Sequence, residues 1–330
     1  MRILVTGATG FIGSNLAASL ATMGYDTVVT GRAETQVEIG RLKQLQSAGV
    51  SVQAGSLLDT GFAAKIVHGC DAVIHLAAAQ HEGNVPDSYF HDINVVATRL
   101  LVQAAIDAGT RRFVYGSTIG VYGEAAEGQL DEDSPLRPAN IYGRTKAEAE
   151  TVVSEYAARI QTCIARISET YGPGDFRLLK MFRAIARGRF PVIGPGTNLR
   201  QVIYVDDLVR ALLMTAEQAS AVGQTFVLCG SDVMNTNQMV QKVAMAVGHP
   251  PPRIRVPIWP FRAAAAVLEH TLSPLGIQPP LTQRRLDFFT KSFVFSTEKC
   301  RKVLNFVSQT PFEVGAAKTA QWYRDFGYLG

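Results

Sequence analysis

Short, mainly apolar runs alternate with amphipathic stretches through the first half of the chain. The runs read RILVT, DTVVT, VSVQA, AVIHLA, RFVYGS and TCIARI, and stretches such as SNLAASLATM and INVVATRLLVQAAIDAG lie between them. The runs do not alternate apolar and polar positions, which is typical of strands that helices cover on both faces. The repeated alternation predicts an α/β fold with a doubly wound parallel sheet of the Rossmann type.

The pattern changes at about residue 167. Glycine and proline interrupt the stretches YGPGD, PVIGPGTN and HPPPRIRVPIWP, with the strand-like QVIYV and TFVLC and the helix-like DDLVRALLMTA among them. We expect a sheet domain over residues 1–167 and a smaller, irregular lobe over residues 168–330. The segment from about 202 to 230 is expected to return to the sheet.

Composition narrows the class of protein. Of the 330 residues, 47% are hydrophobic and 18% are charged, which predicts a large buried core and excludes a disordered chain. The net charge of +4 suits an anionic small molecule. Because the cations are scattered along the chain, nucleic acid is not an expected partner.

Cysteine spacing and hydropathy bear on the compartment. Cys70, Cys163, Cys229 and Cys300 lie far apart with no CxxC pair, so we expect buried thiols in a reducing compartment and neither a metal nor a disulfide. No stretch reaches the roughly 18 apolar residues that cross a bilayer, and no signal peptide fits the first residues. A cytoplasmic protein with no membrane partner is expected.

Three glycines follow the first predicted strand. Gly7, Gly10 and Gly13 form GxxGxxG where that strand turns into a helix. Such a turn lets the backbone approach a pyrophosphate and offers it the positive end of the helix dipole. A turn in this position, within a βαβ unit, predicts dinucleotide binding.

The end of the second predicted strand indicates which dinucleotide. It carries Gly31 and Arg32 in VVTGRAE, and no acidic residue that would bond a ribose 2′-hydroxyl. A small residue followed by an arginine suits a 2′-phosphate, so NADP is favoured over NAD.

Tyr142 and Lys146 form a candidate catalytic pair in NIYGRTKAEAE. Their spacing of four places both on one face of a helix. A phenol has an ordinary pKa of about 10, and an ammonium group one turn away favours the phenolate. Tyr142 could then exchange a proton with a secondary alcohol or ketone while hydride moves to or from the nicotinamide.

Ser117 and Thr118 end the fifth predicted strand, in RFVYGSTIGVYG. Doubly wound folds bind ligands at the carboxyl ends of their strands. A hydroxyl group there can bond a substrate oxygen and stabilise the charge that develops on it.

Together these motifs resemble the extended short-chain dehydrogenase/reductases, also called the NAD-dependent epimerase/dehydratase family. TGATGFIG, HLAAA, INVVAT, GSTIGVYG, YGRTK, ARISETYGPGD and LRQVIYVDDL match its successive motifs over nearly the whole chain. The resemblance implies Thr118, Tyr142 and Lys146 as the catalytic set, with Ser117 as an auxiliary hydroxyl. It also implies a homodimer formed through two helices that border the sheet.

The resemblance also implies binding residues. The implied cofactor-binding set, with NAD(P) as cofactor, is Gly7, Thr9, Gly10, Phe11, Ile12, Gly13, Arg32, Ser56, Leu57, Leu76, Ala77, Ala78, Asn94, Tyr142 and Lys146. Thr118, Glu169 and Arg200 are the implied substrate-binding residues. Ser56 replaces a frequent aspartate near the adenine, and Glu169 replaces a frequent asparagine that faces the substrate. A carboxylate beside a pyrophosphate is repelled unless a cation neutralises it.

Three functions remain open on this basis. The first is a nucleotide-sugar epimerase or 4-ketoreductase, supported by Arg200 at the position of the family's phosphate-binding arginine and by Arg177, Lys180 and Arg183. The second is an NADPH-dependent ketoreductase similar to 3β-hydroxysteroid dehydrogenases and dihydroflavonol reductases, whose pocket the aromatic stretch LDFFTKSFVF could line. The third is a non-catalytic NAD(P) sensor, which would not need Tyr142 and Lys146.

Overall fold

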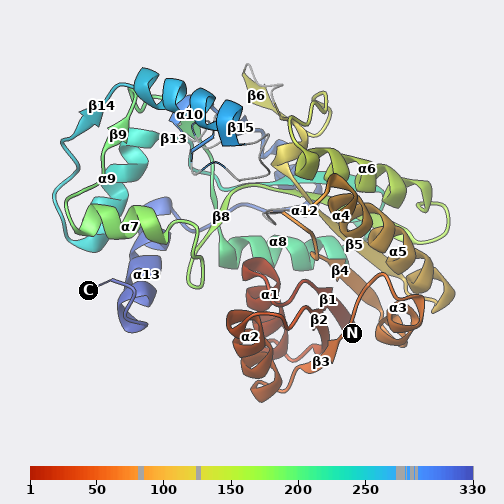
Figure 1. The fold of residues 1–330 in the computed structure, drawn as a ribbon. Coiled ribbons are helices and arrows are strands. Elements are labelled where there is room, and N and C mark those ends of the chain that lie inside the picture. Colours follow the sequence, from red (N-terminus) through yellow and green to blue (C-terminus); the bar gives the residue numbers. More distant parts are fainter. Residues whose placement is uncertain are drawn as a thin grey trace.

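A seven-stranded parallel sheet forms the centre of the computed structural model (Figure 1), which confirms the predicted α/β fold. The structure describes residues 1–80, 85–123, 128–272, 279, 281–282, 286 and 289–329. The strands run in the order β12-β7-β5-β4-β1-β2-β3. They are β1 (Arg2–Thr6), β2 (Asp26–Gly31), β3 (Ser51–Ala54), β4 (Ala72–His75), β5 (Arg112–Thr118), β7 (Gln161–Ile167) and β12 (Gln224–Leu228).

Helices cover both faces of this sheet, as the apolar strands require. Successive strand residues point to opposite faces, so Ile3 and Val5 join one hydrophobic cluster while Leu4 joins the other. The first cluster packs under α1 (Phe11–Thr22), α2 (Gln36–Ser47) and α8 (Val205–Glu217). The second packs under α3 (Thr60–Val67), α5 (Ala97–Asp107) and α6 (Ile141–Glu155).

A second group of helices lies beside the sheet, at the left of Figure 1. It comprises α7 (Leu179–Ala186), α9 (Thr236–Val247) and α13 (Phe312–Asp325), whose side chains share a separate core around Phe182, Val243 and Tyr323. The helix α10 (Trp259–Leu272) lies above them, and Ala265 is its buried residue. The part of the chain that the structure describes contains no helix with the length and apolar character needed to span a bilayer.

The remaining elements are short. Two-residue strands pair as β6 (Gln129–Leu130) with β15 (Val294–Phe295), β8 (Thr170–Tyr171) with β11 (Ile203–Tyr204), β9 (Val192–Ile193) with β14 (Arg255–Val256), and β10 (Leu199–Arg200) with β13 (Met234–Asn235). The short helices are α4 (Asp87–His91), η1 (Asp92–Val96), η2 (Ile119–Val121), η3 (Ala219–Ala221) and α12 (Glu298–Leu304). Within the segment 202–230, β12 enters the sheet beside β7, whereas β11 pairs with β8 outside it.

The parallel arrangement brings the carboxyl ends of the strands to one edge. The strand order reverses between β1 and β4, and this reversal is where doubly wound sheets open a ligand crevice. Gly7 follows β1, Leu76 follows β4, and Thr118 ends β5. The fold therefore places the predicted cofactor turn and the predicted catalytic segment along the same edge.

Candidate active site

The turn between β1 and α1 requires glycine at two of the three predicted positions. Gly7 has a φ of +71°, and a Cβ atom there would lie 2.8 Å from the backbone of Leu76 and Ala77. A Cβ atom on Gly13 would lie 2.3 Å from the carbonyl oxygen of Gly7. The helix begins after Gly10, which has no side chain to cap the first amides. These amides and the helix dipole therefore fit the pyrophosphate of a dinucleotide.

A side chain of β1 holds the loop after β4 against this turn. The hydroxyl of Thr6 accepts hydrogen bonds from the two amides that follow His75, both at 3.1 Å, and lies 2.7 Å from Nδ1 of His75. The hydroxyl of Thr6 therefore donates a hydrogen bond to Nδ1. This leaves the ring proton on Nε2, which lies 3.0 Å from the hydroxyl of Thr98. Burial and the charge of Lys146 lower the pKa of His75 to about 3, so the ring is neutral.

Asn94 joins this loop to the helix that carries the candidate catalytic pair. It lies in η1, a π-helical turn of the kind that often occurs at functional sites. Its side chain accepts a hydrogen bond from the amide of Ala79 (2.8 Å), and donates to the carbonyl of Ala79 (3.0 Å) and to the hydroxyl of Thr145 (2.9 Å). Asn94 thus positions the loop against α6, whereas its contact with a cofactor stays a prediction.

The other implied cofactor residues lie along the same sheet edge. Phe11 and Ile12 form the first turn of α1, and Ser56 and Leu57 follow β3. The predicted residue Arg32 follows β2 and donates a hydrogen bond of 2.7 Å to the hydroxyl of Tyr89. The strand order accounts for this convergence, because β3, β2, β1 and β4 are neighbours in the sheet.

The helix α6 brings Tyr142 and Lys146 to this edge. Asn140 caps the helix by accepting a hydrogen bond of 3.0 Å from the amide of Gly143. A Cβ atom at Gly143 would lie 2.7 Å from the carbonyl oxygen of Gly120, in the turn after β5. Glycine therefore permits the helix to approach the Ser117-Thr118 segment closely.

Lys146 is a buried cation. Lys146 is 1% exposed, and its Nζ lies 4.0 Å from the centre of the Tyr115 ring. Burial lowers the pKa of Lys146 to about 7, although the carboxylate of Glu150 acts in the opposite direction. Its protonation can therefore change near neutral pH.

The two hydroxyl groups at the end of β5 have different surroundings. Thr118 is half-buried, and its hydroxyl accepts a hydrogen bond of 3.1 Å from the amide of Gly120. Ser117 is buried and donates a hydrogen bond of 2.5 Å to the carboxylate of Glu150 on α6. Of the two, Thr118 is the more accessible for a substrate oxygen, and the auxiliary role of Ser117 stays a prediction.

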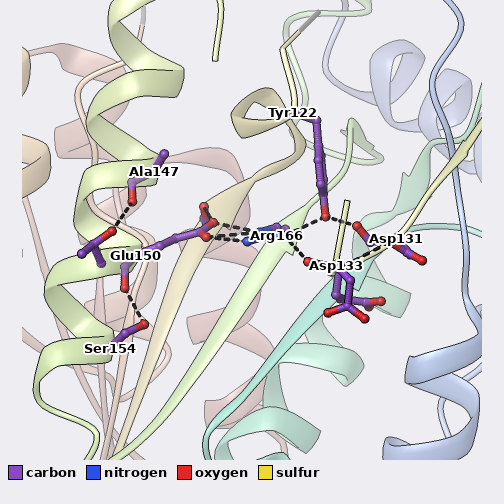
Figure 2. A network of polar contacts seen from close by, with 10 residues as sticks. Tyr122, Asp131, Asp133, Ala147, Glu150, Ser154 and Arg166 are labelled. Carbon is purple, nitrogen blue, oxygen red and sulfur yellow. Dashed lines mark hydrogen bonds and ion pairs between the residues drawn. The ribbon is translucent and has the colours of Figure 1, made fainter. Parts of the chain in front are cut away.

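Glu150 and Arg166 form a buried ion pair at the centre of a polar network, which Figure 2 shows. The guanidinium of Arg166 on β7 contacts both oxygens of Glu150 at 2.8–3.2 Å. Its other side donates to the hydroxyl of Tyr122 (2.9 Å) and the carbonyl of Glu132 (2.8 Å). Burial acts to lower the pKa of Arg166, but the carboxylate of Glu150 raises it above its ordinary value. The guanidinium therefore stays charged.

The predicted substrate residues Glu169 and Arg200 contact each other. Nη1 of Arg200 lies 2.8 Å from both carboxylate oxygens of Glu169. The side chain of Arg200 is 3% exposed, whereas that of Glu169 is 45% exposed. The carboxylate is therefore neutralised by the arginine that the resemblance assigns to substrate phosphates.

A cavity of about 520 Å³ opens beside Glu169. Its lining is mostly apolar, and Arg177 and Lys180 contribute charged side chains. Arg177 donates hydrogen bonds to the carboxylate of Asp175 (3.1 Å) and to the carbonyl of Thr170. The lining residues are Glu169, Thr170, Tyr171, Arg177, Leu178, Lys180, Met181, Ala184, Phe190, Val202, Met239 and Phe289. The cavity has the size of a small-molecule site.

Two features of the site are not among the residues predicted from the sequence. Arg41 on α2 donates hydrogen bonds to the carbonyls of Thr9 (2.6 Å) and Gly174 (3.2 Å), which joins the glycine turn to the YGPGD loop, and no local pattern indicates this role. The Glu150–Arg166 pair, in contrast, is indicated by a pattern in the sequence. Glu150 follows Lys146 by four positions on a helix, and Arg166 interrupts an apolar strand.

Comparison with known proteins identifies the family. Residues 3–229 match the family described as the NAD dependent epimerase/dehydratase family. The chain belongs to this family. The resemblance drawn from the motifs is thereby confirmed, and the chain is an enzyme of the NAD-dependent extended short-chain dehydrogenase/reductase type.

The relatives of the chain within the family have names that refer to different activities and ligands. The chain is 33% identical to the low-salt glycan biosynthesis protein Agl12 of Haloferax volcanii, over 75% of this chain and 83% of that protein. It is 28% identical to a 2-alkyl-3-oxoalkanoate reductase of Stenotrophomonas maltophilia, over 96% and 97%. The solved structure of MoeE5 in complex with UDP-glucose and NAD is 26% identical, covers 99% of both chains and has a TM-score of 0.75.

Proposed function

We propose that this protein interconverts a secondary alcohol and a ketone on a nucleotide sugar, as an epimerase or a 4-ketoreductase. The observation that carries the proposal is the position of Lys146, buried one helical turn after Tyr142, with its Nζ 4.0 Å from the centre of the Tyr115 ring on β5. A family of NAD-dependent epimerases and dehydratases has this chemistry within its range.

The residues of the chain divide the chemical work. Tyr142 removes the hydroxyl proton of the substrate or returns one to the ketone, and the charge of Lys146 favours the phenolate form of Tyr142. The hydroxyl of Thr118 donates to the substrate oxygen as negative charge develops on it. The glycine turn and the first turn of α1 would hold NAD(P), which when bound supplies or accepts the hydride.

The second lobe supports the assignment of the substrate. The cavity beside Glu169 can accept a group that extends from the reacting carbon; Arg177 and Lys180 line it, and Arg200 is paired with the lining residue Glu169. MoeE5, whose structure holds UDP-glucose and NAD, is similar over nearly the whole chain. A diphosphate would take over one or both contacts that Arg200 makes with Glu169, because guanidinium groups bind phosphate oxygens in pairs.

Substitution of Arg200 tests this substrate class. With UDP-glucose, UDP-glucuronic acid and dTDP-glucose as probes, we expect turnover of at least one, and Arg200→Ala raises its KM by about tenfold or more, equivalent to about 1.4 kcal/mol. Glu169→Gln removes the carboxylate that competes with the diphosphate, so it lowers the same KM. Steady-state kinetics measure both effects.

Arg187→Ala is the matched control, because this exposed arginine directly follows α7 and does not line the cavity. Its KM stays at the value of the unchanged protein. An unaltered KM in both Arg200→Ala and Glu169→Gln would rule out the nucleotide-sugar proposal, provided that both variants retain the melting temperature.

A non-sugar ketoreductase is the second candidate, and one observation favours it. Arg200 is already engaged by Glu169, and the cavity beside this pair is lined mainly by side chains such as Tyr171, Met181 and Phe289. Phe289 belongs to the aromatic stretch that the sequence suggested for such a pocket. Reduction of an apolar ketone, with no turnover of the three nucleotide sugars, would favour this candidate.

The preference for NADP is also a proposal. Arg32 is at the end of β2 with its side chain 43% exposed, and its Nη1 lies 3.8 Å from the carboxylate of Glu34. We expect Arg32→Ala to raise the dissociation constant of NADPH by about tenfold and to leave that of NADH within twofold. Cofactor fluorescence measures both constants. Equal losses for the two cofactors would contradict a role of Arg32 at the 2′-phosphate.

Three further predictions are retained as proposals. They are a homodimer, a cytoplasmic location, and a division of labour in which residues 1–167 bind the cofactor and residues 168–330 mainly bind the substrate. The position of β12 in the central sheet supports the expectation that part of the segment 202–230 belongs with the first domain. Light scattering of the purified protein measures its oligomeric state directly.

A further inference from the structure

We propose that Glu150 is a positioning residue of the active site, whose carboxylate, held in place by Arg166 and Ser117, keeps Lys146 positively charged. This inference rests on the proposed role of Lys146 in turnover. It extends that role to Glu150, which acts through Lys146.

The contacts of Glu150 leave its side chain little freedom. Both of its oxygens face the guanidinium of Arg166, at 2.8–3.2 Å, and one of them also accepts the hydroxyl of Ser117 at 2.5 Å. Both charged side chains are less than 10% exposed. A buried charge pair with this geometry has one arrangement, so the negative charge has a defined position relative to α6.

The two charges of the Glu150–Arg166 pair lie on different elements of the fold, and this sets the direction of the pair's electric field. Glu150 lies on α6 one turn after Lys146, whereas Arg166 lies on β7, and Lys146 is stacked over Tyr115 of β5. The guanidinium is held at its other side by Tyr122 and by the carbonyl of Glu132. The negative end of the pair is therefore carried by the catalytic helix, and the positive end by the sheet.

The charged and titratable groups described around Lys146 lie on α6, β5, β4 and β7. Glu150 acts on it from its own helix, Tyr115 lies beneath it on β5, His75 on β4 is neutral, and Arg166 on β7 is the cation that pairs with Glu150. Burial disfavours the ammonium form, and Glu150 opposes this effect. Without the carboxylate, Lys146 would lose its proton at a lower pH and would no longer favour the phenolate of Tyr142.

The test is a direct titration of Lys146 in the protein without substrate or cofactor. Lysine labelled with ¹³C at Cε reports protonation by NMR, and Lys146→Met assigns the signal. The midpoint in the unchanged protein is expected near pH 7, and Glu150→Gln lowers it by about one pH unit or more. In Glu150→Asp, which keeps the charge, the midpoint returns most of the way to that of the unchanged protein.

Two further variants make the result unambiguous. Glu150→Gln alone leaves Arg166 buried without its counter-charge, so Glu150→Gln/Arg166→Met is measured beside it, and the lowered midpoint persists there. Glu148→Gln is the matched control, because Glu148 is on the exposed face of the same helix, two positions from Lys146. In Glu148→Gln the titration midpoint of Lys146 stays at the value of the unchanged protein. Equal midpoints in all of these proteins would overturn the proposal.

Turnover provides a second readout. If activity requires the Lys146 cation, the rate falls as the pH rises through the pKa of Lys146. In Glu150→Gln this alkaline fall therefore begins at a lower pH, while Glu148→Gln has the profile of the unchanged protein. The titration needs no substrate, so failure to turn over nucleotide sugars leaves it interpretable. Conversely, an unshifted Lys146 signal would leave the proposed reaction intact and remove only the role of Glu150.

Discussion

Tyr142→Phe is expected to lower kcat by about 10²–10⁴-fold, the usual contribution of a positioned acid–base group. The ring and its packing on α6 are retained, so the loss would come from the missing hydroxyl. The dissociation constant of NAD(P)H should stay within about twofold, because the glycine turn and α1 are unchanged. Single-turnover hydride transfer and cofactor fluorescence separate the two quantities.

A second tyrosine of the same helix is the control. Tyr156 caps the carboxyl end of α6, and the guanidinium of Arg159 lies 5.8 Å from the centre of its ring. It is distant along the helix from Tyr142, and Tyr156→Phe should leave kcat unaltered. A Tyr142→Phe variant that retains more than a tenth of the activity would show that another group transfers the proton.

Arg166→Met is expected to reduce the free energy of unfolding by about 3–5 kcal/mol, since it leaves the carboxylate of Glu150 buried without its cation. The side chain also loses its contacts with Tyr122 and the carbonyl of Glu132. Denaturant unfolding of the purified protein measures the change.

The double variant Glu150→Gln/Arg166→Met distinguishes the charge effect from lost packing. With both charges removed, neither partner is left as a buried ion, and we expect at least about 2 kcal/mol of the loss to be recovered. An exposed pair on the surface, Arg99 with Glu155, provides the comparison, because Arg99→Met should change stability by less than about 1 kcal/mol. Additive losses in the double variant would mean that the buried pair contributes no coupling.

Local patterns of apolar residues are sufficient to predict the strands of the central sheet. Each strand of the central sheet lies within or close to an apolar run, because burial on both faces selects such residues at consecutive positions. The turn was equally local, since the positive φ of Gly7 and the close contact at Gly13 involve residues within one strand, turn and helix. The helical spacing of Tyr142 and Lys146 required only the helix period.

The partners of the site residues were less predictable. Arg200 and Glu169 are both predicted substrate residues, and the sequence does not indicate that they contact each other. Ser117 was expected to assist catalysis, and its hydroxyl contacts Glu150. In both cases the partner lies more than thirty positions away, so no pattern of neighbouring residues indicates the contact.

Patterns in the sequence suffice to predict the parallel sheet, the glycine turn between β1 and α1, and the helical register of Tyr142 and Lys146, because each depends on residues close together in the chain. Which charges face one another, and how deeply they are buried, depends on the folding of the whole chain. Electrostatic energy depends on distance and on the exclusion of water, and both are set by the packing of α6 against β5 and β7.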